Sequence, residues 1–221
     1  MGLPRIVKKI LPQNWVYAYE QREQHKKMHN TMSVEDWIKA GKPLPAPVVV
    51  KRSAMIEYAK RFNATHFIET GTFMGDTTMA LKGYFDKLDT IELDEKLAKR
   101  AKEVFKSYNH ITTWQGDSGV KLKEILDKLP KNIVCFFWLD GHFSGGITAK
   151  ADLNTPISAE LNTIFEHNKH HVIFIDDARL FFSGEADYPS YEELVKQITM
   201  YDNSVMIESI DDIIRITPSV K

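Results

Sequence analysis

From residue 64 onward the chain alternates short apolar runs with longer segments in which apolar residues recur at helical spacing. The predicted strands are 65–69, 89–93, 111–115, 133–140, 171–177, 204–209 and 212–217, and the predicted helices are 74–84, 94–107, 118–128, 155–168 and 190–200. This alternation is typical of a parallel β-sheet covered by helices on both faces. Only a few residues separate the last two strands, which predicts an antiparallel hairpin at the sheet edge. The sequence therefore predicts a doubly wound α/β fold with a seven-stranded, mostly parallel sheet.

The length of the chain, 221 residues, fits one large domain with an extension better than two full domains. Residues 1–50 combine basic charge with several aromatic residues, and residues 41–53 contain three prolines, which favour extended backbone. We interpret residues 1–50 as an extension or lid and residues 51–221 as the main domain. Apolar residues at helical spacing near the start predict a short amphipathic helix: Leu3, Ile6, Val7, Ile10 and Leu11. Such a helix could dock on its own domain, form a homo-oligomer with a second subunit, or lie on a membrane surface.

The composition, with 43% hydrophobic and 27% charged residues and a net charge of -1, is that of an ordinary globular protein. It lacks the basic charge that favours a nucleic-acid partner. No apolar stretch approaches the roughly 20 residues that span a bilayer, and the N-terminus lacks the pattern of a signal peptide. The single cysteine, Cys135, lies in an apolar run, as expected for a core residue in a reducing compartment. We therefore expect a cytoplasmic protein.

Polar and glycine residues follow the first three predicted strands. In open parallel sheets, ligands bind outside the carboxyl ends of the strands, near the point where the strand order reverses. The first strand leads into FIETGTFMGDTT, residues 67–78, whose glycines allow a tight turn and a close approach of the backbone to a ligand. The second strand reaches Glu92, an acid that can accept hydrogen bonds from both hydroxyls of a ribose. The third leads into residues 116–118, Gly-Asp-Ser. The simpler alternatives are a structural turn, a solvated strand end at Glu92 and a helix N-cap at Asp117.

The succession acid-x-Gly-x-x-x-Gly, strand-end acid and Gly-Asp-Ser resembles the S-adenosylmethionine-binding half of class I methyltransferases over about residues 54–217. The resemblance implies a Rossmann-like domain whose cofactor-binding residues are Glu69, Gly71, Thr72, Gly75, Glu92, Asp117, Ser118 and Asp140. In it the first turn shapes the pocket for the methionine and sugar portions, Glu92 holds the ribose, and Asp117 lies beside the adenine amino group. A nicotinamide-dependent oxidoreductase is the competing enzyme class, but it would normally show a G-x-G-x-x-G phosphate turn.

A second group of polar residues follows the fourth and fifth predicted strands. The fourth ends in FFWLDGHFSGG, residues 136–146, so Asp140 and His142 leave the sheet at the edge just described, and the fifth ends with Asp176 and Asp177. Converging carboxylates repel one another unless positive charge lies among them, and oxygen ligands favour Mg²⁺. The alternatives are an ordinary strand-end acid at Asp140, a loop histidine at His142, and helix capping or pairing with Arg179 for Asp176 and Asp177.

This second pattern resembles metal-dependent O-methyltransferases of the macrocin O-methyltransferase type. The resemblance implies that Asp140, Asp176 and Asp177 bind the metal and that His142, beside Asp140, is the catalytic base. It further implies methyl transfer to a hydroxyl of a sugar, glycoside or other small molecule. The alternative of a different class is a catalytically silent methyltransferase-like interaction module. Residues 178–191 could line the acceptor or pack under a loop, and His170 and His171 are expected at the surface or at a helix end.

Overall fold

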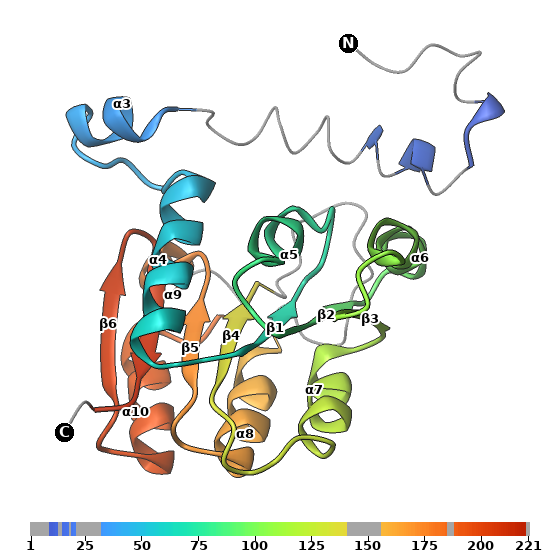
Figure 1. The fold of residues 1–221 in the computed structure, drawn as a ribbon. Helices are drawn as coiled ribbons and strands as arrows, with labels where there is room; N and C mark the ends of the chain where they lie inside the picture. The colour runs from blue at the N-terminus through green and yellow to red at the C-terminus, as the bar shows by residue number, and fades with distance from the viewer. Residues whose placement is uncertain are drawn as a thin grey trace.

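The structure is a computed structural model and describes residues 9–12, 15–17, 19–20, 32–140, 156–184 and 188–219 (Figure 1). The strands are β1 (His66–Thr70), β2 (Lys87–Glu92), β3 (Ile111–Gln115), β4 (Cys135–Leu139), β5 (Val172–Ile175), β6 (Met206–Ile210) and β7 (Ile213–Thr217). The helices are α3 (Val34–Lys39), α4 (Val48–Arg61), α5 (Asp76–Leu81), α6 (Glu95–Phe105), α7 (Ser118–Leu126), α8 (Ile157–His167), α9 (Ala178–Ser183) and α10 (Tyr191–Tyr201).

All strands join one seven-stranded sheet in the order β3-β2-β1-β4-β5-β7-β6. Neighbours from β3 to β5 pair parallel, whereas β7 pairs antiparallel with both β5 and β6. The order reverses between β1 and β4, because β2 and β3 lie on one side of β1 and the later strands on the other. The predicted fold class, including the antiparallel edge hairpin, is confirmed.

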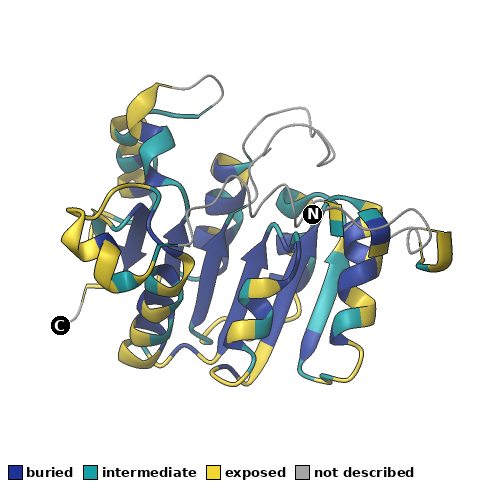
Figure 2. Cartoon of the chain, turned by 90° about the horizontal axis from the view of Figure 1, so that it is seen from above, coloured by how far each residue is buried: buried dark blue, intermediate teal, exposed yellow. Residues whose placement is uncertain are grey.

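Alternate residues of each central strand enter two separate cores. Ile68 and Phe137 pack on the face covered by α7, α8 and α10, whereas Phe67 and Phe136 pack on the face covered by α4, α5 and α6. Side chains of successive strand residues point to opposite faces, so a strand buried on both faces reads as the continuous apolar runs seen in the sequence. Figure 2 shows this burial along the sheet and the exposed outer faces of the helices.

The structure differs from the sequence predictions in the segment that precedes β1. Extended backbone, predicted for residues 41–53, ends at Pro47, and α4 then runs from Val48 to Arg61. The predicted boundary between residues 50 and 51 therefore falls inside a helix. Part of the predicted N-terminal amphipathic helix, including Leu3, lies outside the described residues, while Ile10 is exposed. The short helices α3 and α9 were not predicted, because each offers fewer than two turns of pattern.

Among the histidines before β5, the prediction is right for one and wrong for the other. His170 is exposed, whereas His171 is buried and its Nδ1 accepts a hydrogen bond of 3.0 Å from the backbone N–H of Cys135. Cys135 itself is a buried core residue, as predicted. Within the part of the chain that the structure describes, none of the helices combines the length and the apolar character that a bilayer crossing requires.

Candidate functional site

The carboxyl ends of five neighbouring strands lie in one row, which backbone hydrogen bonds fix. Gly71 N donates to Ile91 O at 3.0 Å, and Gly116 N donates to Glu92 O at 2.9 Å. On the other side of β1, Asp140 N donates to Thr70 O at 3.2 Å, and Asp176 N donates to Leu139 O at 3.0 Å. The residues predicted from separate stretches of sequence therefore share one edge of the sheet, on both sides of the point where the strand order reverses.

The turn after β1 depends on its two glycines. Gly71 and Gly75 have φ angles of 83° and 74°, a left-handed conformation that residues with a side chain rarely adopt. Gly75 also lies against α6, since a Cβ atom there would come within 2.8 Å of Phe105 Cζ. Thr72 Oγ1 lies 2.6 Å from Thr90 Oγ1 and ties the turn to β2. Packing against α6 therefore requires glycine at position 75, whether or not a ligand binds.

Glu69 lies beneath this turn, with only 2% of its surface exposed. Its Oε2 accepts hydrogen bonds of 2.6 Å from the hydroxyls of Thr78 and Thr90. Burial raises the pKa of Glu69 from its ordinary 4.5 to about 8, although these two hydroxyls oppose the rise. Glu69 therefore supports the turn from below as a neutral acid at neutral pH.

Glu92 is fixed at the end of β2 by backbone donors. Its Oε2 accepts from Phe73 N at 2.7 Å, and its Oε1 accepts from Asp94 N at 2.9 Å. Burial raises the pKa of Glu92, and the backbone hydrogen bonds oppose the rise. With 5% exposure it is not the solvated strand end that the sequence left open. Its carboxylate joins the β1 turn to the start of α6.

Asp117 is the N-cap of α7, because its Oδ1 accepts from Val120 N at 3.3 Å. This confirms the capping alternative, and Ser118 is the first residue of the helix. Sequence reasoning missed Glu160 of α8, which is buried behind this helix start. Burial raises the pKa of Glu160 to about 7, and hydrogen bonding with Ser118 opposes the rise. We call residues 69–75 with Glu92, Asp117 and Ser118 the glycine-turn end of the site.

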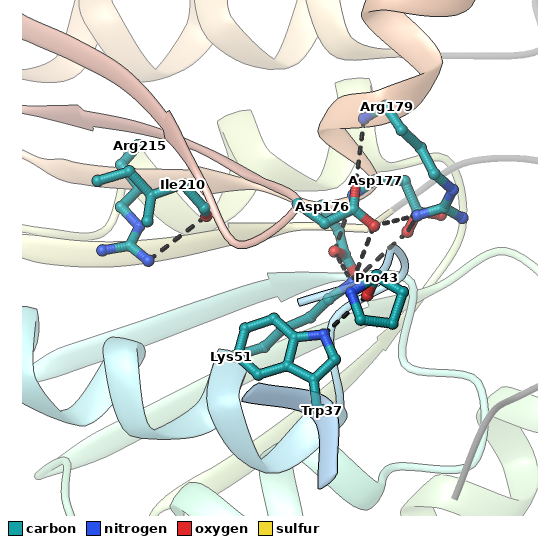
Figure 3. A network of polar contacts seen from close by, with 9 residues as sticks. Trp37, Pro43, Lys51, Asp176, Asp177, Arg179, Ile210 and Arg215 are labelled. Carbon is teal, nitrogen blue, oxygen red and sulfur yellow. Dashed lines mark hydrogen bonds and ion pairs between the residues drawn. The ribbon is translucent and has the colours of Figure 1, made fainter. Parts of the chain in front are cut away.

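At the ends of β5 and β7, aspartates gather around cations from the protein itself (Figure 3). Lys51 Nζ donates a hydrogen bond to Asp176 Oδ1 and lies 3.5 Å from Asp177 Oδ1 and 3.9 Å from Asp212 Oδ2. Burial alone would lower the pKa of Lys51, but Asp176 and Asp177 raise it above its ordinary value. Burial raises the pKa of Asp176, and the ammonium of Lys51 opposes that rise.

Arg179, in α9, binds the same aspartates from the other side. Its Nη1 donates to Asp177 Oδ1 at 2.8 Å and also to Asp212 Oδ2, and its backbone N–H donates to Asp212 Oδ1 at 3.0 Å. The pairing with Arg179 that the sequence left open is thus confirmed for Asp177, whose φ of 55° is one that Asp tolerates better than most residues. We call Asp176, Asp177 and Asp212 with Lys51 and Arg179 the aspartate cluster.

Sequence reasoning missed Lys51 and Asp212, and no motif could have found them, because they come from a helix before the sheet and from the final hairpin. Asp140 stands at the end of β4, in the row of strand ends, while Gly141 and His142 lie outside the described residues. Within 32–140, 156–184 and 188–219, no group of three or more His, Cys, Asp or Glu residues is arranged to hold a metal ion. The aromatic residues of 178–191 lie in different environments. Phe181 is buried in the core, whereas Phe182 is exposed and stacks on Tyr191.

No protein-family model matches the sequence, and no curated protein matches it closely enough to count as a relative. Solved structures do match. The O-methyltransferase TomG from Streptomyces achromogenes, involved in tomaymycin synthesis and solved with S-adenosylmethionine, is 15% identical, with 83% of this chain and 86% of that chain covered and a TM-score of 0.54. A Podospora anserina methyltransferase, PaMTH1, solved with S-adenosylhomocysteine, is 16% identical, with 95% and 98% covered and a TM-score of 0.52.

An O-methyltransferase from Bacillus cereus, solved with S-adenosylhomocysteine, is 14% identical, with 83% of this chain and 88% of that chain covered and a TM-score of 0.52. At such identities the likeness establishes the fold. The chain therefore has the fold of class I methyltransferases and matches these neighbours over most of their length.

Proposed function

We propose that the protein transfers the methyl group of S-adenosylmethionine to a hydroxyl of a small molecule. The observation that carries the proposal is the glycine-turn end, which places a Gly-rich turn and a backbone-anchored Glu92 beside the point where the strand order reverses. The neighbours solved with S-adenosylmethionine or S-adenosylhomocysteine support the choice of ligand. A sugar or glycoside as acceptor rests on the sequence resemblance alone.

The residues at this end fit a sulfonium nucleoside. The turn at Gly71 has no Cβ to obstruct a ligand, and it is not the phosphate-binding turn that a nicotinamide dinucleotide would require. Glu92 would bind the ribose hydroxyls, and Asp117 with Ser118 would flank the adenine. Glu69 would keep the turn in shape from beneath. Bound S-adenosylmethionine would supply an activated methyl group, which leaves the protein to align the acceptor and remove its proton.

His142 is the proposed base for that proton, with Asp140 beside it at the end of β4. A base must reach the acceptor hydroxyl within hydrogen-bond distance, and the segment that follows β4 begins at the required edge of the sheet. No step of this mechanism uses the predicted Mg²⁺. Two of the three predicted Mg²⁺ ligands, Asp176 and Asp177, already bind Lys51 and Arg179, so they do not fit an open metal site.

Calorimetric titration with S-adenosylmethionine tests the cofactor, and a screen of sugar, glycoside and phenol acceptors, read by mass increase, tests the reaction. We expect binding, and a gain of one methyl group on a hydroxylated acceptor. His142→Ala should then bind the cofactor as before but lose roughly 10²- to 10⁴-fold in rate. His170→Ala, at an exposed position, should keep the wild-type rate. Absence of cofactor binding would contradict the proposal. Binding without turnover on any acceptor would favour the interaction module.

A further inference from the structure

The position of Lys51 follows from how α4 packs on the sheet. Lys51, Met55 and Tyr58 are buried and share one face of the helix, four and three residues apart. Tyr58 packs edge-on against Phe174 of β5, with ring centroids 5.1 Å apart, and its hydroxyl donates to Glu208 Oε1 of β6 at 2.7 Å. The same face therefore carries Lys51, less than two turns earlier, to the carboxyl end of β5.

The ammonium of Lys51 lies among three carboxylates. It is hydrogen-bonded to Asp176 and lies 3.5 Å from Asp177 and 3.9 Å from Asp212. The lysine side chain is 8% exposed and the aspartate side chains are 11%, 13% and 0% exposed, so water contributes little to their neutralisation. An ammonium has three N–H donors and no acceptor, which suits a position enclosed by carboxylate oxygens.

We propose that the ammonium of Lys51 is the built-in cation of this site and takes the place for which the pattern Asp140, Asp176 and Asp177 predicts a divalent metal ion. The ammonium already occupies the space between Asp176 and Asp177, so a metal ion at this place would have to displace it or lie close enough for the two positive charges to repel. The lysine is covalently part of the chain and is held by the packing of α4, so it occupies this place whenever the fold is intact. The aspartates are then neutralised by Lys51 and Arg179, with no metal between them.

The proposal that Lys51 takes the place of the metal ion does not depend on the proposed function. The test is therefore direct binding of Mn²⁺, a spectroscopic substitute for Mg²⁺, measured by electron paramagnetic resonance on the full chain without cofactor or acceptor. The variants are Lys51→Gln, which removes the charge at similar length, and Lys51→Arg, which keeps it. Lys60→Gln, an exposed lysine on the same helix, is the matched control.

We expect wild type, Lys51→Arg and Lys60→Gln to bind Mn²⁺ only weakly at this site. Lys51→Gln should bind one ion per chain at least about tenfold more tightly, the equivalent of about 1.4 kcal/mol, and the double variant Lys51→Gln with Asp176→Asn should lose that gain. A merely structural lysine would cost stability on removal without this gain. Folded Lys51→Gln that binds Mn²⁺ no better than wild type overturns the proposal.

If Lys51→Gln does not fold, Mn²⁺ binding to wild type and to Asp176→Asn still tests the proposal. Tight binding of one Mn²⁺ per wild-type chain, lost in Asp176→Asn, would overturn the proposal. Weak binding that Asp176→Asn leaves unchanged supports it. Where turnover is measurable, chelation should leave the wild-type rate unchanged, and Mg²⁺ should restore part of the rate only to Lys51→Gln. Failure of the proposed function, seen as no binding of S-adenosylmethionine, leaves the Mn²⁺ result readable.

Discussion

The two halves of the sheet edge hold their acids in opposite ways. At the glycine-turn end, Glu69 and Glu92 accept hydrogen bonds from hydroxyls and backbone N–H groups. In the aspartate cluster, Asp176, Asp177 and Asp212 are bound by the cations of Lys51 and Arg179. Burial raises the pKa of both glutamates against the effect of these donors, whereas the effect of burial on Asp176 is opposed by the charge of Lys51. One edge of one sheet thus holds its acids by hydroxyl and backbone donors on one side and by cations on the other.

The largest effect is expected from removing one charge of the aspartate cluster. Asp212→Asn keeps the shape and the left-handed backbone but leaves Lys51 and Arg179 with less negative charge. Breaking a buried ion pair by removing one partner costs about 3–5 kcal/mol, and we expect about 3, because the side chain of Arg179 is 35% exposed. Urea unfolding measures it. Asp211→Asn, at the neighbouring position, removes only longer contacts with Lys42 at 3.5 Å and Arg215 at 3.7 Å and should cost less; equal costs for the two variants would abolish the contrast.

The next effect concerns pH at the glycine-turn end. Because the pKa of Glu69 rises from 4.5 to about 8 on folding, the native state holds a proton that the unfolded state releases between these values. Its stabilising contribution is complete below pH 4.5 and is lost as the pH rises through 8. Between pH 6 and pH 9, wild type should lose about 2 kcal/mol more of its unfolding free energy than Glu69→Gln. Urea unfolding of both proteins, with exposed Glu103→Gln as control, measures the difference; parallel pH profiles would show that Glu69 is ionised like the aspartates.

Glu92→Ala sharpens the comparison by ligand binding. It removes a hydrogen-bonding carboxylate from the proposed ribose position, so S-adenosylmethionine should bind about tenfold more weakly, or about 1.4 kcal/mol. Calorimetry on protein shown by circular dichroism to be folded measures this, with exposed Glu95→Ala as control. Unchanged affinity would show that the ribose does not bind at the end of β2.

The smallest effect is expected at Asp117. Asp117→Ala removes the N-cap of α7 and should cost about 1 kcal/mol of unfolding free energy, whereas Asp117→Asn, which can still cap, should be nearly neutral. Thermal unfolding distinguishes the two. If Asp117→Ala leaves stability unchanged yet weakens cofactor binding, the main role of Asp117 is to bind the cofactor and not to cap the helix.

The same contrast explains what could be predicted from the sequence. Every strand and the glycine-turn end were found, because apolar runs mark buried strands and because each residue of that end lies in or beside a strand that the pattern reveals. The aspartates of β5 were found for the same reason. Their partners were not: Lys51 lies 125 residues from Asp176 along the chain, and α4 shows little amphipathic pattern beside its three consecutive valines. The sequence indicated that the converging aspartates need a nearby cation, but only the packing of α4 identifies it as Lys51.

The distant origin of Lys51 and Asp212 has a consequence for how the protein matures. During synthesis from the N-terminus, Lys51 leaves the ribosome well before Asp176 and Asp177, and Asp212, directly before β7, follows later still. Since Asp212 directly precedes β7, which is inserted between β5 and β6 in the sheet, the aspartate cluster cannot be complete before β7 has been synthesised. The aspartate cluster therefore joins a helix that precedes the sheet to the hairpin of β6 and β7, and it forms only when these distant segments have come together.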